Sequence, residues 1–434
     1  MPIRLRPALP LVISALLCAC GASSNSSTTP YTLGGTVSGL SRDGLVLANG
    51  SDTLAIASGA TSFSFGSTTG NYEVTVATQP EGQTCSVSNG SGSGGSEVSN
   101  VVVSCRAYMA YVANSGGYSL AQFSQGTDGG LSPLSGATVG TSYQPFAIAL
   151  RSDGKYAYAS YMNSAAVTAY SVSSAGALTA LGTVATDSAG YGLAVSPNGK
   201  YVYAANYGSA SVSQFTVGST GKLSAMATPS VAAGTNPYAL AVSPDGNYLY
   251  VANQGSNTIS QYSIGSGGAL TALATASVST TAVGTSPIAI AIDPDSKYVY
   301  VTLADSNKIA QFAIGSTGAL SAMSPASIAT GSSPRSITVS PNGKYAYVAN
   351  FSGNTISQYS IASGKLTAMT VPTIASGTNP LSVTISPDGS YVYATNYTDA
   401  TVSQYLVGSG GALTKLSTAT VTTSGVQPGV IAVR

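Results

Sequence analysis

The chain of 434 residues contains no histidine and no tryptophan, and only 7% of its residues are charged. Without histidine, neither a Ser-His-Asp or Cys-His catalytic arrangement nor a histidine zinc site can be assembled. The formal net charge is +1. This near-neutral balance argues against nucleic acid as a partner, because nucleic-acid binding needs a concentrated basic surface. The sequence predicts no metal site and no cofactor.

Carboxylates are also scarce, and most of them have a structural explanation. The three glutamates all precede residue 107, so later acidic residues are aspartates. Several aspartates stand in a recurring Ser-Pro-Asp-Gly-like turn, where Asp is favoured because its side chain bonds its own backbone. A turn role is predicted for Asp153, Asp245, Asp295 and Asp388.

From Tyr108 onward, the chain consists of seven similar sequence repeats. An apolar run led by Pro or Gly recurs every 45 to 50 residues, at Pro145, Gly190, Pro237, Pro287, Pro334, Pro380 and Pro428. Each unit divides into four short apolar runs separated by turn residues, and no run has a helical period. This period with several strands per unit is typical of a β-propeller blade.

The counts of two strand types predict how the ring closes. Second-strand segments begin near Tyr108, Tyr156, Tyr201, Tyr248, Tyr298, Tyr345 and Tyr391. The first of these lacks an innermost strand before it, whereas residues 428–433 form a spare one at the end of the chain. We therefore predict an all-β chain in which a seven-bladed propeller, residues 107–434, is closed by pairing 428–433 with 108–114, which removes an open sheet edge.

The first residues indicate export. Arg4 and Arg6 precede an apolar stretch that is too short to span a bilayer. Leu17-Cys18-Ala19-Cys20 resembles the lipobox of bacterial lipoproteins, which implies a signal peptide over 1–19 and lipidation of Cys20. Residues 20–30 are a polar, flexible tether. The resemblance implies a lipid anchor in the cell envelope, with Gly21 favouring the outer membrane, and no other membrane contact.

Residues 31–106 are predicted to form a separate small β-sandwich, Ig-like or similar. Its strands are expected at 32–40, 44–47, 53–56, 62–65, 72–77 and 98–105. Cys85 and Cys105 are expected to form one disulfide, because a cysteine pair in an exported protein is usually oxidised and no histidine or further cysteine completes a metal site. A spacer role is expected for this module, with ligand binding as the alternative.

The repeats resemble a known family. Tyr-Val-Ala-Asn at 250–253 and 347–350 and the Ser-Pro-Asp/Asn-Gly-Lys-Tyr turns look like YVTN β-propeller repeats. The whole ring is similar to the seven-bladed lactonase family, which includes bacterial 6-phosphogluconolactonases and fungal muconate cycloisomerases. The resemblance implies lactonase activity with His, Arg and Glu side chains around the channel mouth. Of these, the body of this ring offers only Arg151 and Arg335.

The candidate site follows from the residues after each leading Pro or Gly, which we expect around the channel mouth. They are Phe146, Tyr191, Tyr238, Ile288, Arg335, Leu381 and Gly429. Loops after the second strands are expected to add Tyr207, Phe351 and Tyr397, with Asp305 and Asp399 nearby. One guanidinium among aromatic rings suits an anionic sugar, a carboxylated metabolite or an acidic partner. Alternatively, Arg335 is solvated and the tyrosines pack between blades.

Two functional hypotheses remain. In the first, an envelope lipoprotein with a monomeric propeller binds a partner protein, a glycan or a small anionic ligand through Tyr191, Tyr207, Tyr238, Arg335, Phe351 and Tyr397. In the second, the ring is a lactonase-like hydrolase in which Arg335 polarises the carbonyl and Asp305 or Asp399 activates water. Lysines after the turns (Lys155, Lys200, Lys297 and Lys344) are expected on the opposite face, where they favour solubility or form a basic docking ring.

Overall fold

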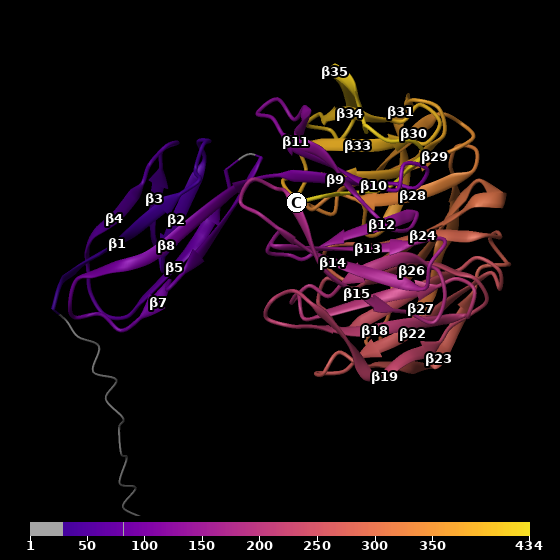
Figure 1. The fold of residues 1–434 in the computed structure, drawn as a ribbon, viewed down its shortest axis with the longest axis horizontal. Helices are drawn as coiled ribbons and strands as arrows, with labels where there is room; N and C mark the ends of the chain where they lie inside the picture. The colour runs from indigo at the N-terminus through magenta and orange to yellow at the C-terminus, as the bar shows by residue number, and fades with distance from the viewer. Residues whose placement is uncertain (1–28, 81) are drawn as a thin grey trace, which may run out of the picture.

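The computed structural model describes residues 29–80 and 82–434, which form a small β-module beside a large β-ring (Figure 1). Apart from one short 3-10 helix, η1 (Ala304–Ser306), the regular structure of these residues is all strand. No helix in this described part is long and apolar enough to cross a membrane. The predicted signal segment 1–19, the lipidation residue Cys20 and most of the tether 20–30 lie outside the described residues.

Two four-stranded sheets make up the module, as expected for a sandwich. One has the order β4-β1-β8-β6 and the other β3-β2-β5-β7. The strands are β1 (Tyr31–Ser38), β2 (Leu45–Asn49), β3 (Asp52–Ile56), β4 (Ser62–Thr68), β5 (Tyr72–Thr78), β6 (Gln83–Ser88), β7 (Ser91–Gly92) and β8 (Val98–Ala107). Leu33, Leu47 and Val103 come from both sheets and lie fully buried in one core. Strand β1 pairs β8 in parallel, and β7 is an addition that the sequence did not predict.

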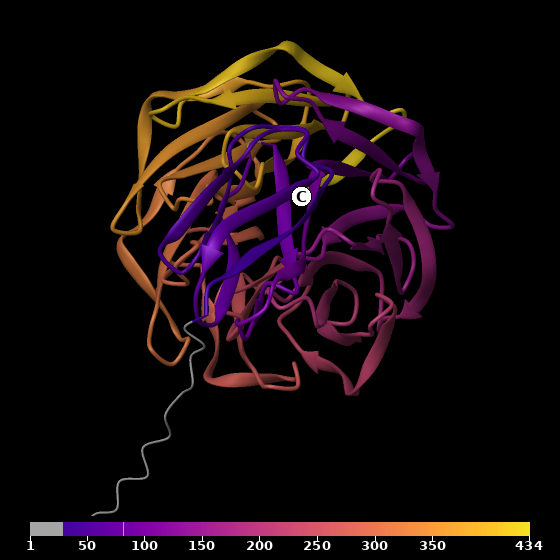
Figure 2. The ribbon, with the colours of Figure 1, turned by 90° about the vertical axis from the view of Figure 1, so that its left-hand side faces the viewer.

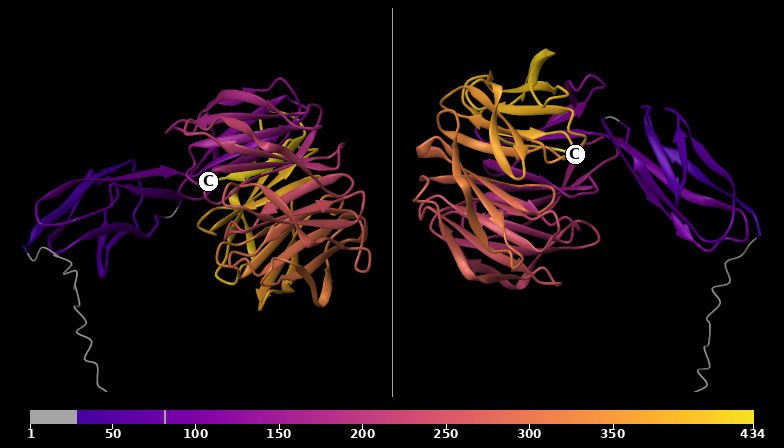
Figure 3. Two further views of the ribbon diagram at one scale, coloured as in Figure 1. Left: turned by 90° about the horizontal axis from the view of Figure 1, so that it is seen from below. Right: turned by 180° about the vertical axis from the view of Figure 1, so that it is seen from behind.

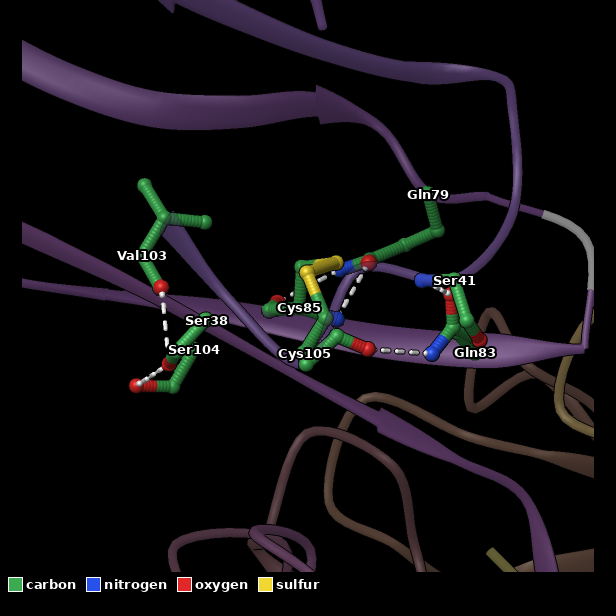
Figure 4. Close-up of a disulfide and its surroundings, with 9 residues drawn as sticks. Ser38, Ser41, Gln79, Gln83, Cys85, Val103, Ser104 and Cys105 are labelled. Carbon is green, nitrogen blue, oxygen red and sulfur yellow. Dashed lines mark hydrogen bonds between the residues drawn. A yellow bond between two sulfur atoms is a disulfide. The ribbon is translucent and has the colours of Figure 1, made fainter. Parts of the chain in front are cut away.

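The predicted disulfide is present and links two neighbouring strands of the module (Figure 4). Cys85 on β6 and Cys105 on β8 are directly opposed in the antiparallel register. The side chain of Gln79 holds the backbone of Cys85 at both ends: the Cys85 amide donates to Gln79 Oε1 at 2.7 Å, and Gln79 Nε2 donates to the Cys85 carbonyl at 2.9 Å. The bond therefore closes an edge that is already ordered by hydrogen bonds.

Seven four-stranded sheets form the ring, which confirms the predicted propeller. The strands of the first three blades are β9 (Met109–Asn114), β10 (Ser119–Gln125), β11 (Leu131–Gly140), β12 (Pro145–Leu150), β13 (Tyr156–Tyr161), β14 (Ala166–Val172), β15 (Leu178–Ala185), β16 (Gly190–Val195), β17 (Tyr201–Asn206), β18 (Ser211–Val217) and β19 (Leu223–Ala232). The fourth and fifth blades contain β20 (Pro237–Val242), β21 (Tyr248–Asn253), β22 (Thr258–Ile264), β23 (Leu270–Ser279), β24 (Pro287–Ile292), β25 (Tyr298–Leu303), β26 (Lys308–Ile314) and β27 (Leu320–Ala329). The last two contain β28 (Pro334–Val339), β29 (Tyr345–Asn350), β30 (Thr355–Ala362), β31 (Lys365–Ala375), β32 (Pro380–Ile385), β33 (Tyr391–Asn396), β34 (Thr401–Val407) and β35 (Leu413–Thr422).

The ring closes as the strand counts predict. The last strand, β36 (Pro428–Val433), completes the first blade by pairing antiparallel with β9, so that Ile431 faces Val112. Main-chain bonds extend this pairing beyond the strand, because the Met109 amide donates to the Arg434 carbonyl at 2.7 Å and the Arg434 amide donates back at 2.9 Å. The two ends of the propeller are thus held in one sheet.

The recurring turn is built from side-chain hydrogen bonds. In the fourth blade, Asp245 accepts a bond from the Asn247 amide, and the Ser243 hydroxyl accepts one from the Tyr248 amide. Asp153 and Asp388 act as Asp245 does. The fifth blade corrects the prediction for Asp295. There Asp293 replaces the serine and its carboxylate accepts from both the Lys297 and Tyr298 amides, while Asp295 forms an exposed ion pair with Lys297 at 3.3 Å.

Neighbouring blades are joined by a repeated tyrosine–glycine bond. The second tyrosine of each Tyr-x-Tyr strand is buried, as is its counterpart in the first blade, and it donates to a glycine carbonyl in the next blade. The pairs are Tyr111–Gly176, Tyr158–Gly221, Tyr203–Gly268, Tyr250–Gly318, Tyr300–Gly364, Tyr347–Gly411 and Tyr393–Gly129. Glycine is required because its φ is positive and a side chain of the preceding blade covers it. A Cβ on Gly318 would lie 2.1 Å from the Tyr248 ring, and tyrosine plays this part everywhere except at Gly176, which Met109 covers.

A glutamine in the third strand makes a second joint between blades. Gln261 accepts a bond from the Leu320 amide of the next blade at 2.7 Å and donates to Thr275 of its own outer strand at 2.8 Å. The same joint is made by Gln122, Gln214, Gln311, Gln358 and Gln404. The second blade departs, because Ala169 stands at this position and has no side-chain amide to make the joint. The preceding residue, Thr168, bonds the Thr183 side chain of the outer strand. Hydrogen bonds from six glutamines and seven tyrosines therefore link neighbouring blades in the interior of the ring.

The module contacts the ring next to its closure. Only Tyr108, which is 2% exposed, separates β8 from β9. The Gly82 amide donates to the Asp388 carboxylate in the turn of the seventh blade, and Arg42 donates to the Gln125 carbonyl of the first. Figure 2 shows the module in front of the ring, and both views of Figure 3 place it on one side of the propeller. This side carries the Ser-Pro-Asp-Gly turns.

Candidate functional site

The innermost strands of all seven blades enclose a central cavity of about 290 Å³. Its mouth is formed by the residues that follow the leading Pro or Gly, as the repeat predicts. Phe146, Tyr191, Tyr238, Ile288, Arg335 and Leu381 all line it. Gly429 does not, and its neighbours Val430 and Ile431 take its place. A Cβ on Gly429 would lie 2.6 Å from the Phe146 carbonyl oxygen, so this strand approaches its neighbour too closely for a side chain.

Arg335 is the charged centre of this cavity. Among the described residues that line it, no other carries a charge. The guanidinium carbon lies 5.3 Å from the centre of the Phe351 ring, which is a cation–π distance. Arg335 Nε is buried and has no hydrogen-bond partner. A buried, unpaired guanidinium nitrogen is costly, so the arrangement is suited to a ligand that brings an acceptor oxygen.

Four aromatic rings form one wall beside the arginine. Tyr191 lies at the centre, with ring centroids 4.8 Å from Phe146, 4.8 Å from Tyr207 and 4.9 Å from Tyr238. These rings come from three successive blades, so the cluster depends on how neighbouring blades pack. Tyr207 also bonds Gln254 at 3.3 Å. The predicted tyrosines therefore gather on the Phe146 side of the mouth and pack on one another.

The tyrosine hydroxyls are donors rather than bases at neutral pH. Burial raises the pKa of Tyr238 to about 12, although the Arg335 guanidinium partly offsets this effect. Tyr238 lines the cavity and is partly buried, so a phenolate there would be poorly solvated. Burial also raises the pKa of Tyr191. Both side chains thus keep their protons available for a ligand oxygen.

The two predicted carboxylates are not among the residues that line the cavity. Asp305 lies in η1, after β25, and is exposed. Asp399 is also exposed, and its carboxylate accepts a hydrogen bond from the Thr378 amide at 2.6 Å. This bond secures the loop that enters the innermost strand of the seventh blade. The structure thus assigns Asp399 a loop contact and brings neither aspartate to Arg335.

Phe351 and Tyr397, like Tyr207, are not among the residues that line the cavity, but they pack together beside Arg335. Their ring centroids are 6.1 Å apart, and Phe351 carries the cation–π contact with Arg335. Sequence reasoning missed the hydroxyls deeper in the cavity, which include those of Ser336 and Ser382. The repeat could have indicated these two serines, because they occupy a position that is alanine in the innermost strands of three other blades, at Ala147, Ala239 and Ala289. No cluster of three or more cysteine or acidic side chains in residues 29–80 and 82–434 offers a metal site.

The model of the family "Lactonase, 7-bladed beta-propeller" matches residues 101–428, about three-quarters of the chain. The chain belongs to this lactonase family. The resemblance of its repeats to that family is therefore confirmed. No curated protein matches the chain.

Solved structures agree with this lactonase fold. A protein from Bacteroides fragilis assigned as a 6-phosphogluconolactonase is 23% identical, with a TM-score of 0.65, over 75% of this chain and 98% of that one. The periplasmic gluconolactonase of Pseudomonas aeruginosa is 20% identical, with a TM-score of 0.65, over 75% and 98%. A protein from Lactobacillus plantarum is 18% identical, with a TM-score of 0.66, over 75% and 99%. At these identities, the similarity establishes the fold.

The polar residues of this propeller differ from the His, Arg and Glu set that the family resemblance implied. Its sequence contains no histidine, and no glutamate occurs after Glu97. The cavity instead combines one guanidinium with phenolic and aliphatic hydroxyls. Such a set can bind and polarise a carbonyl or a carboxylate, and it places no carboxylate beside the ligand.

Proposed function

We propose that this lactonase-family protein hydrolyses a sugar lactone at the mouth of the central channel. The observation that carries the proposal is the guanidinium of Arg335, which lines the cavity of a ring that belongs to this family and whose Nε is buried without a hydrogen-bond partner. A lactone presents a carbonyl oxygen for the arginine and a polyhydroxylated ring for the aromatic wall. The cavity volume suits a ligand the size of one sugar.

The chemistry would depend on electrostatic stabilisation. Water adds to the lactone carbonyl carbon, the carbonyl oxygen gains negative charge, and the ring C–O bond then breaks to give a hydroxy acid. Arg335 would donate to the developing oxyanion, and the Tyr238 hydroxyl would add a second donor. With no carboxylate lining the cavity, proton transfer from the attacking water is left to solvent. Sugar lactones are reactive esters, so stabilisation of the oxyanion alone can accelerate their hydrolysis.

The second candidate is binding without turnover. It is favoured by one observation: no titratable base lines the cavity, whereas Arg335 and the hydroxyls remain to hold a carboxylate. In that case, the propeller is a receptor for a sugar acid or for the acidic group of an envelope partner or glycan. The same residues support both candidate functions, and a measurement of lactone turnover distinguishes between them.

For the cellular setting, we propose an exported protein held in the cell envelope by a lipid on Cys20. The lipobox at residues 17–20 and the disulfide between Cys85 and Cys105 support this proposal, because disulfides persist in oxidising compartments. The periplasmic gluconolactonase of Pseudomonas aeruginosa, which shares the fold, is consistent with it. Replacing Cys20 by serine and following membrane fractionation tests the anchor: the protein should move to the soluble fraction.

The activity test compares two arginines of the same ring. Arg335→Met removes the guanidinium from the cavity, and Arg151→Met is the matched control, since Arg151 is paired with Asp153 in a turn outside the cavity. Proton release from glucono-δ-lactone is measured above the spontaneous rate. We expect kcat/KM to fall roughly 100-fold in Arg335→Met, as when an oxyanion donor is removed, and to be unchanged in Arg151→Met.

Calorimetric titration with gluconate completes the test. Binding of gluconate that is lost in Arg335→Met, without lactone turnover in the wild type, would favour the receptor. Turnover that survives Arg335→Met would contradict a role for this arginine in either candidate. Absence of both turnover and gluconate binding would refute the channel as a sugar-lactone or sugar-acid site.

A further inference from the structure

A second cavity, of about 400 Å³, lies between the module and the propeller. Strands β6 and β8 of the module form one side of it. The turn at 151–155, residues 172–174 of the second blade and Arg434 after β36 form the other. This cleft is on the face of the Ser-Pro-Asp-Gly turns, so it is distinct from the channel mouth. It exists only because the module packs beside the ring closure.

Positive groups from three distant parts of the chain meet in this cleft. They are Arg106 at the end of β8, Lys155 after the turn of the second blade, and Arg434. In a chain with 7% charged residues, this is a marked concentration. Asp153 is the one carboxylate side chain among the lining residues, and it is neutralised by Arg151. Among the described lining residues, positive side chains therefore outnumber negative ones.

Hydrogen bonds to backbone carbonyls hold the two arginines in place. Arg434 Nε donates to the Ser152 carbonyl at 2.7 Å, and Arg106 Nη1 reaches the Ser173 carbonyl at 3.5 Å. Each bond uses one of five guanidinium donors. Neither side chain forms an ion pair within the described residues, and burial lowers the pKa of Arg434. A partly desolvated guanidinium with unpaired charge is stabilised by an incoming anion.

The remaining surface of the cleft is rich in hydroxyl groups and has an apolar floor. Ser86, Ser88 and Ser104 come from the module, and Ser173 and Ser174 come from the propeller. Met109 and Leu150 supply apolar surface. Hydroxyls that both donate and accept match the hydroxyls of a sugar, and the cations match an acidic substituent.

We propose that this cleft binds an anionic sugar, with its acidic group on Arg106, Lys155 and Arg434 and its hydroxyls on the serines. A phosphate monoester fits three cations better than a carboxylate, because it carries close to two negative charges. The ligand is therefore a sugar phosphate, either free or at the end of a phosphorylated glycan. By contacting both parts at once, it also fixes the module on the ring.

The test is calorimetric titration of the full chain with glucose 6-phosphate, glucuronate and unsubstituted glucose. We expect saturable binding in the order glucose 6-phosphate, glucuronate, glucose. Arg106→Gln and Lys155→Gln should each weaken binding of glucose 6-phosphate about tenfold, as expected for one charge-assisted contact. The matched control is Lys200→Gln, which removes the equivalent lysine of the next blade, outside the cleft, and should bind as the wild type does.

Four results would overturn the proposal. They are no saturable binding of glucose 6-phosphate, equal losses in Lys155→Gln and Lys200→Gln, unchanged affinity in both cleft variants, and inorganic phosphate binding as tightly as glucose 6-phosphate. Lactone hydrolysis measured on the same samples separates this proposal from the channel function, because the cleft variants leave the channel intact. Near-ultraviolet circular dichroism shows whether each variant is folded.

Discussion

The module and the propeller use different means to stabilise the same kind of structure. The module is a two-sheet sandwich with one shared core and one disulfide between adjacent strands. The propeller has no cysteine and no covalent link. Its blades are joined by seven tyrosine–glycine bonds and six glutamine–leucine bonds, and its two ends pair in one sheet.

The difference follows from size. A sandwich of fewer than a hundred residues buries a limited apolar area, so a cross-link adds a useful fraction of its stability. A ring gains its stability from the repeated interfaces between its blades, each of which buries apolar side chains and provides hydrogen-bond partners for buried polar groups. Closure matters more to the ring, because an open propeller would expose two sheet edges. The following four experiments test this contrast.

The largest effect is expected from deletion of residues 428–434. The deletion removes β36 together with Ile431, which is 3% exposed in the intact ring, and it exposes the edge of β9. Loss of one buried isoleucine and several ladder bonds should lower the free energy of unfolding by more than about 5 kcal/mol. Thermal melting followed by circular dichroism measures it. A deletion variant that melts with the intact chain would show that closure does not stabilise the ring.

A smaller effect, confined to the module, is expected from Cys85→Ser with Cys105→Ser. The disulfide closes a loop with a sequence separation of 20, and its removal should cost about 3 kcal/mol by increasing the entropy of the unfolded module. In differential scanning calorimetry, the module transition should move to lower temperature while the propeller transition stays in place. Equal shifts of both transitions would indicate that the two parts unfold as one unit.

The glutamine joint is tested by Gln261→Leu. The change keeps an apolar side chain of similar size but leaves the Leu320 amide and the Thr275 carbonyl without their partner. Two unsatisfied backbone groups should cost about 2 kcal/mol. The control is Thr168→Val in the second blade, where Ala169 stands at the glutamine position and no such joint exists. It removes only a bond to the Thr183 side chain and should cost less. Urea denaturation measures the loss in free energy of unfolding for both variants. Equal losses would show that the glutamine joint adds no stability of its own.

The smallest effect is expected from Tyr250→Phe. It removes the bond to the Gly318 carbonyl, which is buried, and should cost about 1 kcal/mol. Tyr248→Phe removes the nearby bond to Ser316, which is longer, at 3.4 Å, and exposed, and is expected to be nearly neutral. Urea midpoints distinguish the two variants. A larger loss in Tyr248→Phe would show that the exposed bond to Ser316 stabilises the joint more than the buried bond to Gly318 does.

Much of the ring was predictable because each blade repeats the same local rules. The predicted starts of the first strands, from Pro145 to Pro428, coincide with β12, β16, β20, β24, β28, β32 and β36. Alternating strands and proline–glycine turns are local features, and they recur seven times. Asp295 shows where local reasoning fails: Asp293, two residues earlier, accepts the turn bonds because its carboxylate stands where other blades place the serine.

The candidate site was only partly predictable. The repeat placed Tyr191, Tyr238 and Arg335 at the mouth, because equivalent positions of a ring converge on its axis. It placed Asp305 and Asp399 in the right loops, but loop position does not determine where a side chain points. The Asp399 carboxylate is instead bonded to the Thr378 amide.

The sequence by itself determined the seven blades, their turns and the scarcity of catalytic side chains, since periodicity and composition can be read without contacts. The tertiary structure decided which groups meet. Only ring closure brings the aromatic wall and Arg335 around one cavity, and only the packing of the module gathers Arg106, Lys155 and Arg434 in one cleft. These residues are far apart along the chain, so no local pattern relates them. Their positions are determined by how the blades and the module pack.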